Sequence, residues 1–401
     1  MAGIVVVGAG QAGAALAAKL RGLGFDGPLT LVGAEPVAPY QRPPLSKKYL
    51  MGEAGVDRLL LRPEAWYAEQ GIALRLGAPV TALDRAAREI EVARARLGYD
   101  RLVLATGAAP RRLPAAVGGD LAGVHVLRDL ADADGLAPEM VAGRRLVVVG
   151  GGYIGLEAAA VAAARGMRVT LLEAAPRILA RVACAETADW FRALHAGHGV
   201  EVLEGATLAR LAGGPRVEAA ELACGRRIGC DAVVVGIGVA PAVALAEAAG
   251  LAVDNGIAVD ALGRTSDPDI WAAGDCASFP HAGGRLRLES VQNAIDMAEA
   301  VAANLMGAGV PYVPQPWFWS DQYDVKLQIA GLGTGADRIV VRDTPPGRSH
   351  WYFAGPRLVS VDAMNDARAY MVGKRLIEAG RSPAAEALAD PATDLRALLR
   401  G

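Results

Sequence analysis

Residues 4–35 read IVVVGAGQAGAALAAKLRGLGFDGPLTLVGAE, and residues 146–173 read LVVVGGGYIGLEAAAVAAARGMRVTLLE. Each stretch contains an apolar run, a turn with the spacing GxGxxG, an alanine-rich segment, a second apolar run and a closing acid. This order predicts a strand, a phosphate-binding turn, a helix and a second strand, as in doubly wound α/β folds. The chain therefore carries one nucleotide-binding pattern twice.

The first copy has Gly8, Gly10 and Gly13 between its first strand and its helix. Glycines at this spacing allow a tight turn, a close approach to a pyrophosphate and close packing of the helix on the sheet. The helix N-terminus adds N–H donors and a favourable dipole for phosphate. Glu35 closes the second strand, where its carboxylate can accept from ribose hydroxyls. These features predict a bound dinucleotide.

The second copy has Gly150, Gly152 and Gly155, and Glu173 closes its second strand. A carboxylate at this position pairs with a ribose 2′-hydroxyl and repels a 2′-phosphate, which favours NADH over NADPH. Arg177 and Arg181 follow closely and keep NADPH open. These arginines could equally contact the adenine or the pyrophosphate.

The rest of the chain up to about residue 310 alternates short Val/Ile/Leu runs with alanine-rich stretches, which predicts parallel sheets. We expect an FAD-binding domain over 1–109 and 231–312, an inserted NAD-binding domain over 110–230 and an α+β domain over 313–401. Further strands are expected at 29–32, 101–105, 146–149, 169–172, 232–235, 338–342 and 350–361, antiparallel ribbons at 87–99 and 215–230, and a helix near 366–379.

The 401 residues include 41 Lys plus Arg against 43 Asp plus Glu. This balance offers no bulk field for nucleic acid, so a charged partner must meet a local patch. No run of about 18 apolar residues or secretory leader is present, which predicts no membrane span and a cytoplasmic protein. Four cysteines and five histidines show no metal spacing, so no metal is expected.

Two further stretches, YDRLVLATG at 99–107 and TSDPDIWAAGDC at 265–276, predict strands that end in small-residue turns. Asp275 is placed to hold a polyol hydroxyl such as that of ribitol, or to cap a following helix, and the two roles are compatible. Cys276 is expected to pack at that helix N-terminus. Because these stretches flank the second nucleotide pattern, we assign the flavin to the first.

The set GAGQAG, GGGYIG, ATG and TSDPDIWAAGD resembles the two-dinucleotide-binding-domain flavoprotein reductases, which have a glutathione reductase-like fold. Within them, PYQRPPLSKKYL (39–50), SVQNA (290–294) and PWFWSDQYDVKLQIAG (316–331) resemble the putidaredoxin reductase-like ferredoxin reductases of bacterial oxygenase systems. The resemblance covers essentially the whole chain. It implies FAD and NADH as cofactors, and a [2Fe–2S] ferredoxin that supplies a cytochrome P450 or a Rieske-type oxygenase.

The resemblance also implies roles for residues on the flavin side. Lys47 is expected near flavin N5, and Trp319 beside the isoalloxazine, although a tryptophan there could instead fill the core at a domain junction. Arg42 is a candidate for binding the flavin or its phosphates, and Val80 for holding the adenine through its backbone. The remaining implied FAD contacts are Gly8, Gly10, Ala12, Gly13, Glu35, Ala105, Thr106, Gly107, Gly274, Asp275 and Val291.

On the nicotinamide side, the resemblance places Glu157 and Glu289 toward the nicotinamide and Ile154 against it. The implied catalytic residues are Lys47, Glu157 and Trp319. The remaining implied NAD contacts are Gly150, Gly152, Tyr153, Gly155, Glu173, Arg181 and Gly238.

The segment LSKKYLMGE at 45–53 contains no cysteine. Disulfide reductases of this superfamily need a CxxxxC pair in this region, and the peroxide-reducing and oxidase relatives need a single cysteine there. Electrons must therefore leave to an external acceptor. We expect hydride transfer from NADH C4 to FAD N5, and then single electrons to a ferredoxin, since this chain lacks the cysteine spacing of a cluster.

Ferredoxins of this type are generally acidic, so a basic patch is expected to guide transient docking. The candidates are Arg62, Arg285, Arg287, Arg338 and Arg342, which could equally be scattered solvated side chains. The alternatives for function are a rubredoxin reductase and a flavoprotein related to apoptosis-inducing factor. A diaphorase that acts directly on quinones is a third and weaker alternative. The expected assembly is a monomer or a homodimer.

Overall fold

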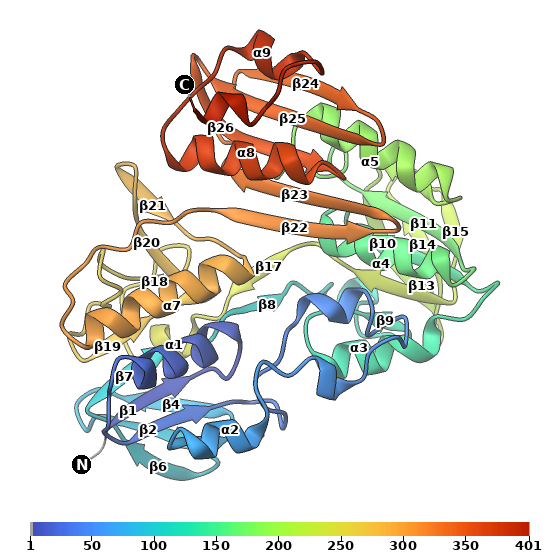
Figure 1. Ribbon diagram of the computed structural model, residues 1–401. Helices are drawn as coiled ribbons and strands as arrows, with labels where there is room; N and C mark the ends of the chain where they lie inside the picture. Colours follow the sequence, from blue (N-terminus) through green and yellow to red (C-terminus); the bar gives the residue numbers. More distant parts are fainter. Residues whose placement is uncertain (1–2, 401) are drawn as a thin grey trace. The chain divides into compact units, whose positions relative to one another are not determined.

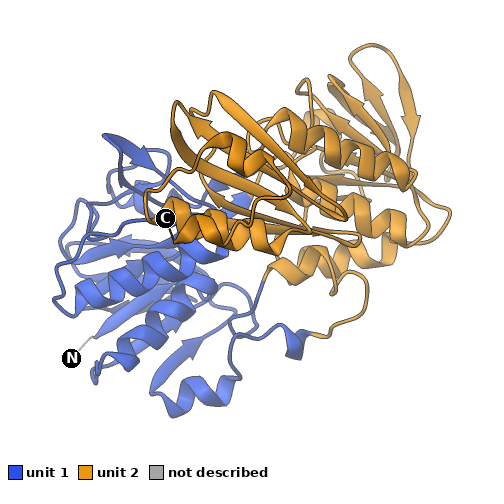
Figure 2. Cartoon of the chain, turned by 45° about the horizontal axis from the view of Figure 1, so that its top comes forward, with its two compact units in different colours: residues 1–41, 56–109, 239–316 blue, residues 42–55, 110–238, 317–401 orange. Residues whose placement is uncertain are grey.

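A computed structural model describes residues 3–400 and is shown as a ribbon in Figure 1. The chain forms two compact units (Figure 2). Unit 1 contains the chain up to Gln41, Val56–Ala109 and Val239–Pro316. Unit 2 contains Arg42–Gly55, Pro110–Gly238 and Trp317–Gly401. Each unit is therefore assembled from three separate parts of the sequence.

Unit 1 is built on a five-stranded parallel sheet in the order β19-β7-β1-β2-β3. The strands are β1 (Ile4–Val7), β2 (Leu29–Val32), β3 (Ile72–Arg75), β7 (Arg101–Leu104) and β19 (Ile270–Ala272). The central strand β1 is buried along its whole length, which explains its continuous apolar sequence. Helix α1 (Gln11–Gly22) follows β1 and packs on α7 (Val291–Leu305).

Most other elements of unit 1 lie in the connections between these strands, and β20 and β21 follow the last one, β19. An antiparallel three-stranded sheet, β4-β5-β6, is inserted before β7 and confirms the ribbon expected at 87–99. The bounds are α2 (Glu64–Glu69), β4 (Val80–Asp84), β5 (Glu89–Val92), β6 (Ala95–Gly98), β8 (Ala108–Pro110), β17 (Val239–Pro241), α6 (Ala244–Ala248), β18 (Ile257–Ala258), β20 (Ala277–His281) and β21 (Gly284–Leu286).

Unit 2 has a second parallel sheet, in the order β12-β11-β10-β16-β9, whose strands β16-β10-β11-β12 repeat the order β7-β1-β2-β3 of unit 1. The strands are β9 (Val124–His125), β10 (Arg145–Val149), β11 (Arg168–Glu173), β12 (Glu201–Glu204) and β16 (Ala232–Val235). A second antiparallel sheet, β13-β14-β15, precedes β16 just as β4-β5-β6 precedes β7. Its strands are β13 (Leu208–Gly213), β14 (Val217–Leu222) and β15 (Arg227–Gly229).

The structure corrects the domain boundary predicted at residue 231. Strand β16 was assigned with the FAD-binding part, but it pairs in parallel with β10, and the boundary between the units falls after Gly238. A run such as AVVV suits the centre of either parallel sheet, because both bury their strands on two faces. Only the pairing of β16 decides which sheet it joins.

Helix α4 (Tyr153–Ala164) of unit 2 is buried on more than one side. It packs on β10, β11 and β16, and also on β22 (Trp317–Gln322) and the short 3-10 helix η1 (Pro43–Ser46). Small alanine side chains allow this close approach from several directions. Glu157 is the only charged residue of the helix and is 2% exposed, so its carboxylate requires partners within the protein.

The C-terminal part of unit 2 is a five-stranded antiparallel sheet in the order β22-β23-β26-β25-β24, with α8 packed on it (Figure 1). The bounds are β23 (Val325–Gly331), β24 (Arg338–Thr344), β25 (Gly347–Ala354), β26 (Arg357–Met364), α8 (Ala367–Glu378) and α9 (Ala385–Ala389). The run predicted as one strand at 350–361 is two strands, because Gly355, with φ +56°, turns the chain. Unit 2 also contains α3 (Leu130–Leu136) and α5 (Ala185–Gly197).

A buried polar cluster joins α5 to this sheet. The Oγ1 atom of Thr187 donates to Asp362 Oδ2 at 2.7 Å, and the Tyr352 hydroxyl donates to the same oxygen. His350 Nδ1 lies 2.7 Å from Thr187 Oγ1. Because the Thr187 hydroxyl already donates its proton to Asp362, His350 Nδ1 must be the donor in this hydrogen bond. Burial raises the pKa of Asp362 to about 6, although both hydrogen bonds act to lower it.

The substitution Asp362→Asn should therefore stabilise the protein more at pH 8 than at pH 5. The pKa of Asp362 in the folded protein, about 6, lies above its ordinary value of 3.8, so its favourable contribution is present at low pH and is lost as pH rises through 6. The difference between the two pH values is roughly 1.5 kcal/mol. Melting temperatures of the parent and the variant measure it.

The substitution Thr187→Val serves as a control because it removes a donor to Asp362 without removing the acid. It should destabilise the protein at both pH values. A gain from Asp362→Asn that is equal at pH 5 and pH 8 would contradict the assigned titration.

Candidate functional site

The glycine turn of unit 1 has one open position and two crowded ones. A Cβ atom on Gly8, which has φ +117°, would lie 2.1 Å from the Ala105 carbonyl oxygen, and one on Gly13 would lie 1.9 Å from the Gly8 oxygen. A Cβ on Gly10 would meet nothing within 4 Å. The first and third glycines therefore permit the turn and the packing, while the middle one faces open space.

The turn of unit 2 has the same three positions. A Cβ on Gly150, with φ +107°, would lie 2.4 Å from the Gly236 oxygen, and one on Gly155 would lie 2.0 Å from the Gly150 oxygen. A Cβ on Gly152 would again meet nothing within 4 Å. Both turns therefore fit a pyrophosphate that approaches the backbone at the middle glycine, directly before a helix N-terminus.

The two closing acids lie at or just beyond the end of the strand that follows each glycine turn: Glu173 is the last residue of β11, and Glu35 follows β2. Glu35 accepts from the Tyr40 hydroxyl at 2.5 Å. The two oxygens of Glu173 accept from the backbone N–H groups of Gly151 and Ala175, each at 2.7 Å. Glu173 is thus fixed against its own glycine turn, in an orientation that leaves further lone pairs for ribose hydroxyls.

Other residues predicted for FAD meet around the turn of unit 1. The Thr106 hydroxyl donates to the Ala242 carbonyl at 2.7 Å. A Cβ on Gly274, with φ +80°, would lie 2.9 Å from the Cβ of Ala12, so the segment after β19 packs on the start of α1. Gly107 also has a positive φ, +71°.

The helix expected after Asp275 is only a short 3-10 helix, η5 (Gly274–Cys276), followed by strand β20. Its N-cap residue is Ala273, so the predicted capping role of Asp275 is wrong. Cys276 is buried as expected, and its Sγ contacts the carbonyls of Leu104 and Ala273 at 3.4 Å. The following helix, α7, begins only at Val291.

Three further predicted residues have defined positions. Val80 begins β4 and pairs with Val92 across the antiparallel sheet. Glu289 belongs to unit 1, where it forms an ion pair with Arg287 at 2.6 Å. Arg42 belongs to unit 2 and donates to the Arg128 carbonyl at 2.9 Å.

Glu157 is held by donors from two other elements of unit 2. Lys47, which follows η1, forms an ion pair through Nζ with Glu157 Oε2 at 2.7 Å. The hydroxyl of Ser46 donates to the same oxygen at 2.5 Å. The hydroxyl of Ser320 on β22 donates to Oε1 at 2.6 Å. The structure therefore brings Lys47 and Glu157 into direct contact.

The two serines were not predicted as site residues. Both lie in segments that the sequence marks, PPLSK and FWSDQ, but a serine there has no spacing that distinguishes it from a loop or strand residue. Trp319 precedes Ser320 on β22 and is half-buried, while Ser320 is fully buried. Because neighbouring residues of a strand face opposite ways, Trp319 points away from Glu157 and lies 5.5 Å from the Trp317 ring.

The remaining residues predicted for NAD surround the turn of unit 2. Ile154, on the first turn of α4, is 43% exposed, which is unusual for a large apolar side chain in this apolar helix. The ring of Tyr153 packs on Phe318 at 4.7 Å. Arg181 Nη2 would lie 3.2 Å from a Cβ on Gly238, so these two positions meet.

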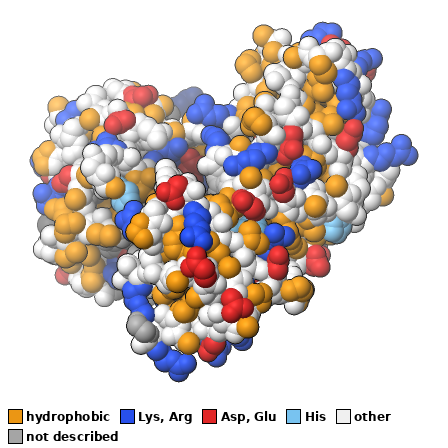
Figure 3. Space-filling model, turned by 90° about the horizontal axis from the view of Figure 1, so that it is seen from above, with side chains coloured by type: hydrophobic (Ala, Val, Ile, Leu, Met, Phe, Trp, Pro, Cys, Tyr) orange, Lys and Arg blue, Asp and Glu red, His pale blue; other side chains and the backbone are white. Residues whose placement is uncertain are grey.

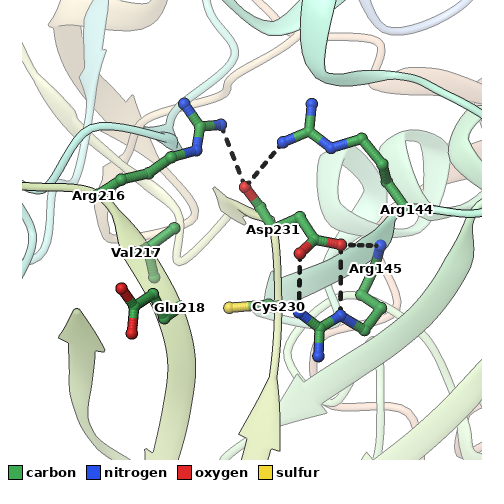
Figure 4. Close-up of a pocket in the computed structure, with 7 residues that line it drawn as sticks. All are labelled: Arg144, Arg145, Arg216, Val217, Glu218, Cys230 and Asp231. Carbon is green, nitrogen blue, oxygen red and sulfur yellow. Dashed lines mark hydrogen bonds and ion pairs between the residues drawn. The ribbon is translucent and has the colours of Figure 1, made fainter. Parts of the chain in front are cut away.

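A separate hollow of about 430 Å³ in unit 2 is not a nucleotide site (Figure 4). Asp231 binds Arg145 through its carboxylate, and its backbone oxygen accepts from Arg144 and Arg216. The hydrogen bond from Arg145 lowers the pKa of Asp231 to about 2. The hollow lies at the amino ends of β10 and β16, whereas ligands of doubly wound sheets bind beyond the carboxyl ends.

Two of the arginines predicted to dock a partner protein are largely buried in the structure. The guanidinium of Arg342 is buried and donates to four backbone carbonyls in the segment 388–393, and Arg287 is 10% exposed and paired with Glu289. Arg342 and Arg287 are therefore corrected to structural residues. Arg62 and Arg338 are exposed, and basic and acidic side chains intermix on the face shown in Figure 3.

Residues 3–400 contain no helix with the length and apolarity that a bilayer crossing demands. Over the same residues, no three His, Cys, Asp or Glu side chains are grouped as a metal ion would need.

The two nucleotide-binding folds with these turns define an oxidoreductase of the flavin and pyridine-nucleotide class. The family model described as pyridine nucleotide-disulphide oxidoreductase matches residues 2–298, and that described as reductase C-terminal matches residues 317–399. The chain therefore belongs to the pyridine nucleotide-disulphide oxidoreductase family. The predicted fold class is confirmed, as are FAD and, at the level of NAD(P)H, the predicted nicotinamide cofactor.

Named relatives narrow this class. The chain is 44% identical over 400 residues to rhodocoxin reductase of Rhodococcus erythropolis, covering 98% of this chain and 93% of that protein. It is 41% identical to the ferredoxin--NAD(+) reductase component of the anthranilate 1,2-dioxygenase system of Burkholderia cepacia, with both chains covered to 98%. A crystal structure of the covalent putidaredoxin reductase–putidaredoxin complex matches with a TM-score of 0.95 and 40% identity, covering 99% of this chain and 98% of that one. The predicted resemblance is confirmed.

The middle glycines offer a test of which turn binds which nucleotide. Gly10 and Gly152 have φ of −94° and −80° and open space at Cβ, so Gly10→Ala and Gly152→Ala should fold normally. A methyl group between backbone and pyrophosphate should weaken binding by about tenfold, or about 1.4 kcal/mol. We expect Gly10→Ala to bind FAD about tenfold more weakly, measured by flavin absorbance, and Gly152→Ala to keep FAD and raise the KM for NADH.

Gly22→Ala in α1 and Gly197→Ala in α5 are matched controls, since a Cβ there also meets nothing within 4 Å. Both should leave flavin content and KM unchanged. The reverse pattern, with flavin lost from Gly152→Ala, would exchange the two assignments.

Proposed function

We propose that this chain transfers electrons from NADH, through bound FAD, to a [2Fe–2S] ferredoxin that supplies a cytochrome P450 or a Rieske-type oxygenase. The observation that carries the proposal is the pair of glycine turns, each with an open middle position, on two parallel sheets in which four strands have the same order, β7-β1-β2-β3 and β16-β10-β11-β12. Two such turns provide for two dinucleotides in one chain, which a reaction between FAD and NADH requires.

When bound, FAD would supply the redox chemistry, as the acceptor of a hydride from NADH and the source of single electrons for the ferredoxin. The residues of this chain are proposed to bind the two nucleotides and to orient them. The turn of unit 1, with Glu35, is proposed to hold FAD, and the turn of unit 2, with Glu173 and Ile154, is proposed to hold NADH. Lys47 is proposed as the donor to the flavin ring, and its ion pair with Glu157 fixes its ammonium.

The acceptor is proposed to be external because no thiol is available beside Lys47. The segment 45–53, LSKKYLMGE, contains no cysteine, whereas the disulfide enzymes of this superfamily have a CxxxxC pair in this region. The four cysteines of the sequence are free thiols, and Cys184, Cys230 and Cys276 are buried. Burial raises the pKa of Cys230 to about 11, which makes that thiol unreactive.

The choice of NADH is proposed from the position of Glu173. Its carboxylate, at the end of β11, is fixed by the backbone N–H groups of Gly151 and Ala175. Neither of these two partners is a cation. A 2′-phosphate brought to this carboxylate would be repelled, while a 2′-hydroxyl can donate to it.

Replacing Glu173 with Arg should reverse this preference. We expect the KM for NADH to rise by about tenfold and the ratio of kcat/KM for NADPH over NADH to rise by more, since a repulsive pair becomes an attractive one. Steady-state kinetics with both nucleotides measure the ratio.

Glu204→Gln is the matched control, because Glu204 faces Glu173 across β11 and β12 and also accepts from a backbone N–H, that of Ile178, at 2.9 Å. It should leave the ratio unchanged. An unchanged ratio in Glu173→Arg would remove Glu173 from nucleotide selection.

The proposed acceptor is tested by reduction of cytochrome c with NADH. Turnover should require an added acidic [2Fe–2S] ferredoxin and should fall as salt rises, because charges are screened beyond about 10 Å at 0.1 M ionic strength. Arg62→Glu and Arg338→Glu, at exposed sites, test the docking surface through the KM for ferredoxin. Full activity without a ferredoxin would instead identify a diaphorase.

A further inference from the structure

Beyond Lys47 and the serines, the carboxylate of Glu157 is connected to a longer chain of polar side chains in unit 2. Ser320 Oγ accepts from Gln322 Nε2 at 3.1 Å. Gln322 Oε1 lies 2.8 Å from His195 Nε2, and the Tyr323 hydroxyl lies 3.1 Å from His195 Nδ1. Ser320, Gln322 and His195 are each 0% exposed.

The chain crosses three elements that are distant in sequence. Glu157 lies on α4, Ser320 and Gln322 on β22, and His195 on the last turn of α5. Tyr323, with φ +56°, sits in the turn between β22 and β23, and its ring stacks on exposed His198 at 3.6 Å. A polar path thus leads from a buried carboxylate to the protein surface.

The ion pair with Lys47 sets the direction of every hydrogen bond in this path. Glu157 accepts, so the Ser320 hydroxyl must donate its proton to Oε1, and its oxygen must accept from the Gln322 amide N–H. The Gln322 oxygen then faces His195, which must carry its proton on Nε2. Nδ1 is left to accept from the Tyr323 hydroxyl.

His195 is held in this neutral form. Burial lowers its pKa to about 4, and the neighbouring charged or titratable groups on the packed elements are His198 on its own helix and Tyr323 on the β22–β23 turn. One tautomer of His195 is therefore compatible with an accepting Glu157. The opposite tautomer would reverse the amide of Gln322 and leave Ser320 unable to donate to Glu157.

We propose that Tyr323, His195, Gln322 and Ser320 form a polarised hydrogen-bond chain that positions Glu157 as an acceptor, so that Gln322 and His195 are positioning residues for hydride transfer. This inference rests on the proposed function, in which Glu157 faces the nicotinamide. The chain orients the carboxylate and does not conduct protons, because passage through the Gln322 amide would require an unstable imidic acid form.

The tautomer is tested by nitrogen NMR of the oxidised holoenzyme labelled with [15N]histidine, without NADH. We expect His195, assigned by the loss of its signals in His195→Leu, to be the neutral Nε2–H tautomer across pH 6–8. Gln322→Leu should mix its tautomers. A wild-type His195 protonated on Nδ1 would overturn the proposed direction of the chain.

The positioning role is tested by stopped-flow reduction of the flavin by NADH. Gln322→Leu should slow hydride transfer by about tenfold while the Kd for NADH stays within about twofold, and Tyr323→Phe should have a smaller effect of the same kind. If Gln322→Leu does not fold, the rate of hydride transfer in Tyr323→Phe tests the positioning role instead.

Tyr312→Phe is the matched control, since that hydroxyl donates a single hydrogen bond, to Asn293 at 3.0 Å, in unit 1. It should change neither rate nor tautomer. Altered tautomers with an unchanged rate would overturn the positioning role. A wild-type flavin that NADH does not reduce would overturn the proposed function, while the NMR result would still decide whether the chain is polarised.

Discussion

The ion pair between Lys47 and Glu157 is the constraint on which much of unit 2 depends. Glu157 is the only charge on a helix whose other residues allow close packing on several sides, and a buried carboxylate is costly unless donors surround it. Those donors come from the end of η1 and from Lys47 directly after it, with Ser46 111 residues before Glu157, and from β22, with Ser320 163 residues after Glu157. Three distant segments must therefore meet for α4 to be buried.

The two nucleotide-binding folds show how one local solution serves two roles. In each, the first and third glycines are crowded by backbone and the middle one is open, and in each an antiparallel three-stranded sheet precedes the parallel strand (β7 or β16) that pairs with the strand before the glycine turn. The repeat therefore extends well beyond the glycine turns that identify it in the sequence. What differs is the environment of the helix, because only the second helix carries a buried acid toward the C-terminal sheet.

Sequence reasoning succeeded where the signal is local. The strands around both glycine turns, the ribbon before β7 and helix α8 have the expected positions, since each is encoded by periodicity and turn residues within a short window. It failed where partners are distant. The place of β16, the burial of Arg342 under the segment 388–393 and the short η5 after Asp275 all depend on contacts that a linear pattern does not contain.

The sequence by itself determined that the chain binds two dinucleotides, that the second turn closes with an acid suited to NADH, and that no cysteine stands beside Lys47. These follow from residue types at fixed spacing, which local backbone geometry converts directly into structure. Only the tertiary structure decided which side chains surround Glu157 and in which direction their hydrogen bonds run. The physical reason is that a buried carboxylate needs donors within hydrogen-bond distance. Ser320, Gln322 and His195 come together only after β22 has packed on α4 and His195 of α5 has met Gln322.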